Sequence, residues 1–138
     1  MKTIALISCV SKKLPYPAKA CDLYISPLFR LNLAYANKLC ADSIYILSAK
    51  YGLLDIDAVI EPYDATLNTM PDSQIRVWAQ QVVKQIKDNE DVATTHFVLL
   101  AGNKYRKYLL PHLLSYEVPL EGLTIGKQLQ RLKRLVYE

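Results

Sequence analysis

Three short apolar runs constrain the fold of this chain more than any other feature. They span residues 3–9, 44–47 and 96–101, and each consists almost entirely of aliphatic, aromatic or β-branched residues. Strands with one solvated face alternate apolar and polar residues, whereas continuous apolar runs are typical of strands that helices cover on both faces. The three runs therefore predict the buried strands of a parallel sheet.

Helical patterns separate these runs. Ser26-Pro27 predicts the start of the first helix, because serine can cap free backbone amides and proline tolerates the first helical position. The apolar residues that follow at helical spacing are Leu28, Leu31, Tyr35 and Leu39. A second helix is predicted to open at Thr69 or Met70 and to end at the polar run 88–91, which we interpret as a solvated loop. Its apolar stripe consists of Ile75, Trp78, Ala79, Val82 and Ile86.

The last third of the chain continues the alternation. Asn103 can cap a third helix, and Pro111 must end or kink it because proline lacks an amide and crowds the preceding turn. Residues 117–120 predict a short edge strand, and a last amphipathic helix is predicted from Lys127. Strands and helices thus alternate, which predicts an α/β fold: a three-layer sandwich around a mostly parallel sheet of four or so strands.

The bulk composition indicates one folded domain. Of 138 residues, 51% are hydrophobic and 22% are charged, which is typical of globular proteins and sufficient for a buried core. The chain has no repeat or linker, so we expect a single domain over residues 1–138. No apolar run reaches the ~20 residues needed to cross a bilayer, and the N-terminus lacks a cleavage site. The sequence therefore predicts a cytoplasmic protein that does not enter membranes.

The cysteines and histidines do not indicate a metal site or a disulfide framework. Cys9, Cys21 and Cys40 are odd in number and widely spaced, whereas zinc sites usually bring a close cysteine pair. We interpret Cys9 as a buried strand-end thiol, and His96 and His112 as structural residues. The sequence predicts no metal and indicates no particular cofactor.

The segment 48–64 is the richest candidate site. A turn that only reversed the chain would use Asn, Asp, Ser and Gly, but this one adds an amine, two phenols and two acids. Ligands of open α/β sheets bind outside the carboxyl ends of the strands, where this segment begins. The candidate catalytic residues are Ser48, Glu61 and Asp64, and the candidate ligand-binding residues are Tyr51, Gly52 and Tyr63. The alternative is an ordinary turn shaped by Pro62, with two exposed acids.

Three further loops are expected at the same edge of the sheet. The first carries Ser11, Lys12 and Lys13, which resemble an anion-binding loop but lack the glycine spacing of a P-loop. The others contribute Gly102, Lys104, Tyr105, Gly126 and Lys127 as candidate ligand-binding residues. A solvated basic loop is the alternative for residues 11–13.

Basic residues concentrate in the second half of the chain. The net charge is only +4, from 17 Lys and Arg against 13 Asp and Glu, so the distribution of charge matters more than its sum. Lys127, Arg131 and Arg134 share one face of the last predicted helix. Basic residues beside Tyr105 and Tyr108 suit a nucleotide or single-stranded nucleic acid, and a solvated helix face is the alternative.

Six motifs resemble those of a prokaryotic domain family of unknown function that is related to the YaaA peroxide-stress proteins. The motifs are Ser8 to Lys13, Asp22 to Tyr24, Ser48 to Leu54, Glu61 to Asp64, Ala101 to Tyr105 and Gly126 to Leu129. The resemblance to the uncharacterised family covers nearly the whole chain. The resemblance to YaaA is narrower: a strand, Ser48, a Tyr-Gly turn, and Pro-Tyr after a short gap.

The resemblance to YaaA implies a DNA-associated role in limiting oxidative damage. A related domain beside enzymes that modify deazaguanine bases in RNA implies recognition of a base or nucleotide. This chain is about half as long as a YaaA protein and lacks the helix-hairpin-helix-like insertion of that family. The resemblance therefore does not extend to binding of intact duplex DNA.

Three functional hypotheses follow. The first is a strand-end pocket for a nucleobase, nucleotide or single-stranded nucleic acid. In it Tyr51, Tyr63 and Tyr105 supply stacking or phenolic hydrogen bonds. Ser11, Lys12, Lys13 and Lys127 hold phosphate, and Glu61 and Asp64 bind the base or sugar. The second is an enzyme that acts at a glycosidic or phosphoester bond through Glu61 or Asp64. The third is a non-enzymatic module that binds DNA through its basic C-terminal helix.

Overall fold

The protein folds around a five-stranded sheet with the strand order β4-β3-β1-β6-β7. The structure, a computed structural model, describes residues 1–8 and 12–138. The strands are β1 (Lys2–Ser8), β3 (Ser43–Ser48), β4 (Gly52–Asp55), β6 (Thr95–Leu100) and β7 (Ser115–Glu117). All neighbouring pairs are parallel except β3 and β4. The predicted α/β sandwich with a mostly parallel sheet is confirmed.

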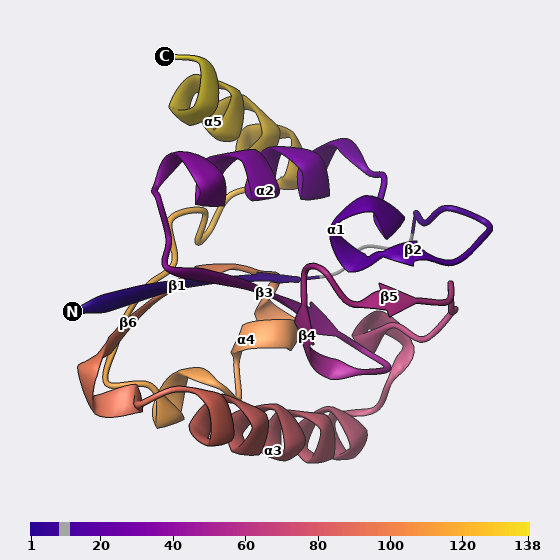
Figure 1. Cartoon of the computed structure of the whole chain (residues 1–138), viewed down its shortest axis with the longest axis vertical. Helices are drawn as coiled ribbons and strands as arrows, with labels where there is room; N and C mark the ends of the chain where they lie inside the picture. The colour runs from indigo at the N-terminus through magenta and orange to yellow at the C-terminus, as the bar shows by residue number, and fades with distance from the viewer. Residues whose placement is uncertain (9–11) are drawn as a thin grey trace.

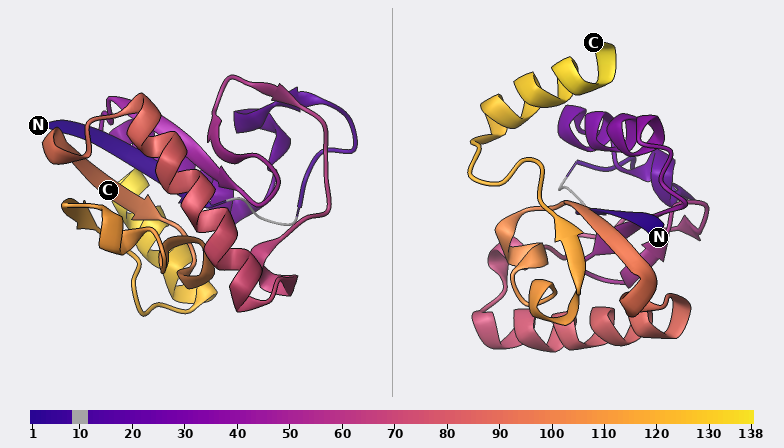
Figure 2. Two further views of the ribbon diagram at one scale, coloured as in Figure 1. Left: turned by 90° about the horizontal axis from the view of Figure 1, so that it is seen from below. Right: turned by 90° about the vertical axis from the view of Figure 1, so that its left-hand side faces the viewer.

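Helices cover both faces of the sheet (Figure 1). α2 (Pro27–Lys38) lies on one face and α3 (Asp72–Asn89) on the other. α5 (Ile125–Tyr137) packs over α2 and projects beyond the sandwich, as Figure 2 shows. Lys38 joins the two helices, because its Nζ donates to the backbone oxygen of Leu135 at 2.7 Å.

The central strand carries the core. Ile4, Ala5, Leu6 and Ile7 of β1 are all fully buried, so this strand has no solvated face. β1 pairs with β3 on one side and with β6 on the other. The interpretation of the apolar runs as strands buried on both faces is therefore confirmed for the centre of the sheet.

The two long helices begin for reasons visible in the sequence. Ser26 caps α2 as predicted, and its Oγ accepts a hydrogen bond from the Phe29 amide at 3.2 Å. α3 begins at Asp72, later than the predicted Thr69 or Met70, because a separate 3-10 turn, η1 (Leu67–Thr69), precedes it. The predicted apolar stripe of α3 is buried, together with Val83.

The segment 48–64, for which the sequence analysis expected no strand, contains β4 and β5. β4 pairs with β3 as an antiparallel hairpin, and β5 (Val59–Ile60) pairs with β2 (Ala18–Lys19) in a small second sheet. A short helix, α1 (Ala20–Leu23), follows β2, and its amides at Ala20 and Cys21 donate to backbone oxygens in the 56–58 turn. β2, β5 and α1 form a lobe beside the main sheet (Figure 1).

The elements after β6 are shorter than predicted. α4 (Asn103–Arg106) begins after Gly102, and Asn103 is its first residue and not its cap. Pro111 lies in a 3-10 turn, η3 (Leu110–His112), which separates α4 from β7. β7 lies at the sheet edge as predicted, but it spans Ser115–Glu117 and not 117–120, so Pro119 lies outside the strand.

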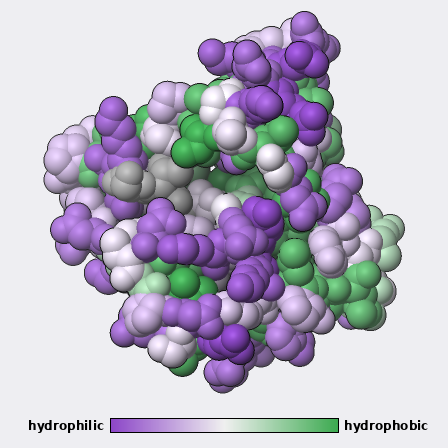
Figure 3. All heavy atoms as spheres, turned by 180° about the vertical axis from the view of Figure 1, so that it is seen from behind, coloured by the Kyte–Doolittle hydropathy of each residue, from purple (hydrophilic) through white to green (hydrophobic). Residues whose placement is uncertain are grey.

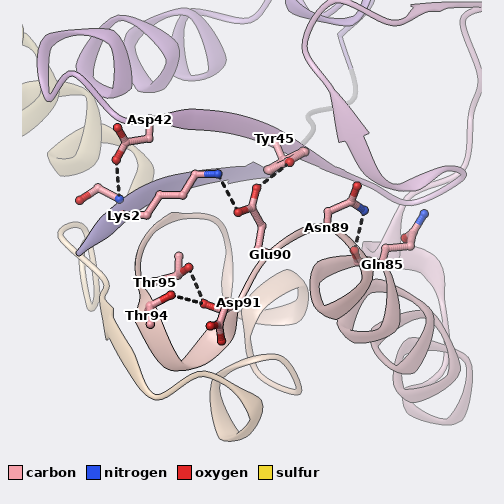
Figure 4. A network of polar contacts seen from close by, with 10 residues as sticks. Lys2, Asp42, Tyr45, Gln85, Asn89, Glu90, Asp91, Thr94 and Thr95 are labelled. Atoms are coloured by element: carbon pink, nitrogen blue, oxygen red, sulfur yellow. Dashed lines mark hydrogen bonds and ion pairs between the residues drawn. The ribbon is translucent and has the colours of Figure 1, made fainter.

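Polar residues at the amino ends of the strands tie the sheet to its connections (Figure 4). The Glu90 carboxylate accepts hydrogen bonds from Lys2 Nζ at 2.8 Å and from the Tyr45 hydroxyl at 3.0 Å. Burial is the main cause that raises the pKa of Tyr45. The hydrogen bond to Glu90 and the negative charge of that carboxylate raise this pKa further. The interpretation of the 88–91 run as a solvated loop is wrong for Glu90, whose side chain is 7% exposed.

The histidines and cysteines form no metal centre in the part of the chain that the structure describes. His96 Nδ1 shares a 2.7 Å hydrogen bond with Ser115 Oγ across β6 and β7. Cys21 and Cys40 are free thiols, and Cys9 lies outside the described residues. No three His, Cys, Asp or Glu side chains gather there in a metal-binding arrangement. No helix in the described ranges has the length and apolarity to cross a membrane.

Candidate functional site: a cavity at the strand ends

The carboxyl ends of β1, β3 and β6 meet at one edge of the sheet, because these strands are parallel. Ser8 ends β1, and its Oγ accepts a hydrogen bond from the Gly102 amide at 3.3 Å, just after β6. This contact joins the end of β1 to the predicted site loop that begins at Gly102. The edge is the position at which open α/β sheets bind ligands.

A cavity of about 520 Å³ opens at this edge. Ser8 and the end of β6 contribute one side, α4 and η1 a second, and the start of α5 with α2 a third. The view from behind shows the surface hollowed at its centre, with hydrophobic residues within and hydrophilic residues around it (Figure 3). The volume lies in the range of about 300–1,000 Å³ that is usual for small-molecule sites.

Asn32 is the most informative residue of the cavity wall. It is 4% exposed, and among the described residues its Oδ1 has no hydrogen-bond partner. A buried acceptor without a partner destabilises a protein and is rare in folded structures. The sequence analysis missed Asn32, although a signal was present: it follows Leu28 by four residues, on the apolar stripe of α2.

Two cations lie in the wall on the side of α4. Lys104 Nζ donates to the Asn68 backbone oxygen at 3.2 Å, and Arg106 Nη1 donates to the Ala101 backbone oxygen at 2.6 Å. An ammonium has three donor hydrogens and a guanidinium five, so both side chains can also donate to a ligand. No Asp or Glu is among the described residues that line the cavity, which favours an anionic ligand.

A cluster of hydroxyl groups lies next to the end of β3. Ser48 Oγ and Tyr63 Oη share a 2.7 Å hydrogen bond, and Tyr63 Oη and Tyr24 Oη share one of 2.6 Å. The Tyr51 ring meets the Tyr63 ring edge to face, and Lys13 Nζ lies 4.5 Å from the Tyr63 ring centroid. Ser48 and Tyr24 are fully buried, so this hydroxyl cluster holds the 61–66 segment against β3.

Trp78 connects the hydroxyl cluster to the cavity. Its Nε1 donates to the Ser48 backbone oxygen at 2.8 Å, and its ring meets the Tyr105 ring edge to face. Tyr105 lines the cavity, and its hydroxyl accepts from the Leu67 amide at 3.3 Å. The predicted residues of the hydroxyl cluster and those of the cavity wall are therefore neighbours, because both groups contact the buried Trp78.

The predicted site residues divide into three groups. Gly102, Lys104 and Tyr105 line the cavity. Lys13, Ser48, Tyr51 and Tyr63 belong to the hydroxyl cluster, with Gly52 in the adjacent turn. Lys12, Glu61, Asp64, Gly126 and Lys127 are exposed and do not line the cavity. Ser11 lies outside the described residues.

Comparison with known proteins places the chain in a family. The model of a family of unknown function, DUF6884, matches residues 4–134. The chain belongs to this family. No curated protein and no solved structure was found to match it. The comparisons provide no link from DUF6884 to the YaaA proteins. The match covers every described residue that lines the cavity.

The cavity of this DUF6884 member combines three kinds of chemistry. The buried Asn32 amide can hydrogen-bond a neutral polar edge, Lys104 and Arg106 can hold an anion, and the half-buried Leu28 and Val118 provide apolar surface. α5 also begins at the rim, where Ile125 lines the cavity and the first helical amides carry partial positive charge. A ligand would match all three if it had a ring with apolar faces and a polar edge, together with a negatively charged group.

Proposed function

We propose that the protein binds a nucleobase or nucleotide, free or within single-stranded nucleic acid, in the strand-end cavity. One observation carries this proposal: a cavity of nucleotide size is lined by two cations, by no described carboxylate, and by the buried Asn32, whose Oδ1 has no hydrogen-bond partner among the described residues. A planar base can lie against the apolar wall while its edge meets the amide. The phosphate can lie beside the cations.

The geometry changes the roles expected for the tyrosines. Tyr51 and Tyr63 pack on each other and do not line the cavity, so we assign them to holding the 61–66 segment. Thr66 and Asn68, which follow that segment, do line the cavity. Tyr105 is the aromatic residue of the wall, and it is the candidate for ring contact with a base.

The proposal concerns binding, and the geometry gives less support to bond cleavage. Glu61 and Asp64, the candidate acid and base, have exposed side chains and are absent from the cavity wall. A general acid or base must reach the proton that it transfers. The motif resemblance to YaaA extends the proposal to a role in DNA protection or base modification. No chemical step of such a process is assigned to Glu61 or Asp64.

Replacement of Lys104 by alanine tests the phosphate side of the cavity. We expect about fivefold weaker binding of a nucleoside monophosphate, since an exposed ion pair contributes about 1 kcal/mol or less. Titration can be followed by fluorescence of Trp78, the single tryptophan of the chain, which contacts Tyr105 in the wall. Lys107→Ala is the matched control, because Lys107 Nζ lies over the Tyr108 ring and outside the cavity wall. Equal affinities for both variants would contradict this placement of the phosphate.

A second candidate function, binding of single-stranded nucleic acid along α5, has support from the position of that helix. Ile125 and Gln128 line the cavity, while Lys127 and Arg134 of the same helix are exposed. A strand with one base in the cavity would therefore have its neighbouring phosphates near α5.

This candidate predicts a salt dependence. If Lys127 neutralises one phosphate, Lys127→Ala should reduce the slope of log affinity against log salt by about 0.7 for a short single-stranded oligonucleotide. Binding of a mononucleotide should change little. Lys84→Ala on α3, across the sheet, is the control and should retain the slope. A slope that Lys127→Ala leaves unchanged would remove α5 from the proposed interface.

A further inference from the structure

Asn32 occupies a position at which an apolar residue would serve the fold better. It lies on the buried face of α2, with Phe29, Leu31 and Ala36 also buried there. Asparagine is a weaker helix former than leucine, and its buried Oδ1 has no partner among the described residues. An unpaired buried acceptor destabilises the fold, and because Asn32 lines the cavity, a ligand bound there can supply the missing donor.

We propose that Asn32 recognises the edge of an adenine base, which enters the cavity first while its phosphate remains at the mouth. This inference rests on the proposed nucleotide-binding function and adds the orientation and class of the ligand. The side-chain amide offers an acceptor, Oδ1, beside a donor, Nδ2. Adenine offers the complementary pair, because its amino group donates and the adjacent ring nitrogen accepts, and asparagine pairs with both at once.

The exposure of the wall gives the ligand its direction. Asn32 is buried and the apolar Leu28 and Val118 beside the cavity are half-buried, whereas Asn103 and Lys104 of the same wall are exposed. An aromatic base fits against the buried apolar part, where an unmade hydrogen bond is most costly. A phosphate keeps more of its hydration near the exposed Lys104. The reverse orientation would bury the charge beside leucine side chains and leave Asn32 unmatched.

A ligand pair tests the inference without any variant. AMP and purine riboside 5′-monophosphate differ only in the amino group at the base edge. We expect the purine riboside compound to bind the unaltered protein about tenfold to hundredfold more weakly, the effect of leaving a buried polar group without its partner. Equal affinity for the two ligands would overturn the assignment of Asn32 to the adenine amino group.

Asn32→Leu tests the residue itself. We expect AMP affinity to fall about tenfold to hundredfold, while the melting temperature of the free protein rises by about 3–5 °C because the unpaired acceptor is removed. Asn37→Leu is the matched control: the same substitution on the same helix, at an exposed position. It carries the same gain in helix propensity and should leave AMP affinity unchanged.

The outcomes separate this inference from the function on which it rests. If AMP binds the unaltered protein and Asn32→Leu equally well, the adenine assignment is wrong and nucleotide binding stands; a water molecule would then satisfy Asn32. If another nucleoside monophosphate binds more tightly than AMP, the assignment is also overturned. If AMP, CMP, GMP and UMP all fail to bind the unaltered protein, the proposed function fails as well.

Discussion

Replacement of Ser48 by alanine is expected to lower the free energy of unfolding by about 3 kcal/mol, since several hydrogen bonds converge on one buried oxygen. Ser48 Oγ accepts from the amides of Lys50 at 3.3 Å and Tyr51 at 3.0 Å, and it shares a hydrogen bond with the Tyr63 hydroxyl. Alanine would leave these amides without an acceptor at the turn between β3 and β4. The anchor of the 61–66 segment would weaken at the same time.

Equilibrium unfolding in urea measures this effect, with Ser73→Ala as the control. Ser73 is exposed in the first turn of α3, and its replacement should change stability by no more than about 0.5 kcal/mol. The Ser48→Ala and Tyr63→Phe variants should be non-additive, because the two hydroxyls contact each other. A loss below about 1 kcal/mol for Ser48→Ala would contradict a structural role. It would return Ser48 to the candidate catalytic residues.

The three central strands of the sheet could be predicted from the sequence because their signals are local. Each central strand is a continuous apolar run, and the start of α2 depends on Ser26 and Pro27 alone. The lobe could not be predicted in this way. β2 and β5 are two residues long, and they exist only because distant segments pair. No periodicity can appear in so short a strand, so tertiary contact decides its conformation.

The candidate site, like the fold, could be predicted only in part. The edge of the sheet follows from the order of strands and the rule for α/β folds, and it led to Gly102, Lys104 and Tyr105. The sequence did not predict that α2 contributes to the cavity. Helical periodicity indicates which face of a helix is buried, but it does not indicate which element packs against that face. Asn32 was therefore not recognised as a candidate site residue. Its importance depends on a missing hydrogen bond, and that is a property of the folded molecule.

Replacement of Gly52 by alanine is expected to lower the free energy of unfolding by about 2–3 kcal/mol. Gly52 has a φ of +73°, which costs a residue with a Cβ about 1–2 kcal/mol. A Cβ built there would lie 2.3 Å from Gln85 Oε1, which accepts from the Leu53 amide at 2.9 Å. Alanine must displace Gln85, and the loss of that hydrogen bond contributes about 1 kcal/mol more.

Gly126→Ala is the control for this prediction, because both glycines were candidate ligand-binding residues. Nothing lies within 4 Å of a Cβ at Gly126, which is in the first turn of α5, so alanine should stabilise the protein slightly. In a Gln85→Ala background the clash is absent, and Gly52→Ala should cost only the backbone strain of about 1–2 kcal/mol. Equal stabilities of Gly52→Ala and Gly126→Ala, with loss of nucleotide binding only in the former, would instead make Gly52 a ligand contact. The cavity would then have to extend past Trp78 to the β3–β4 turn.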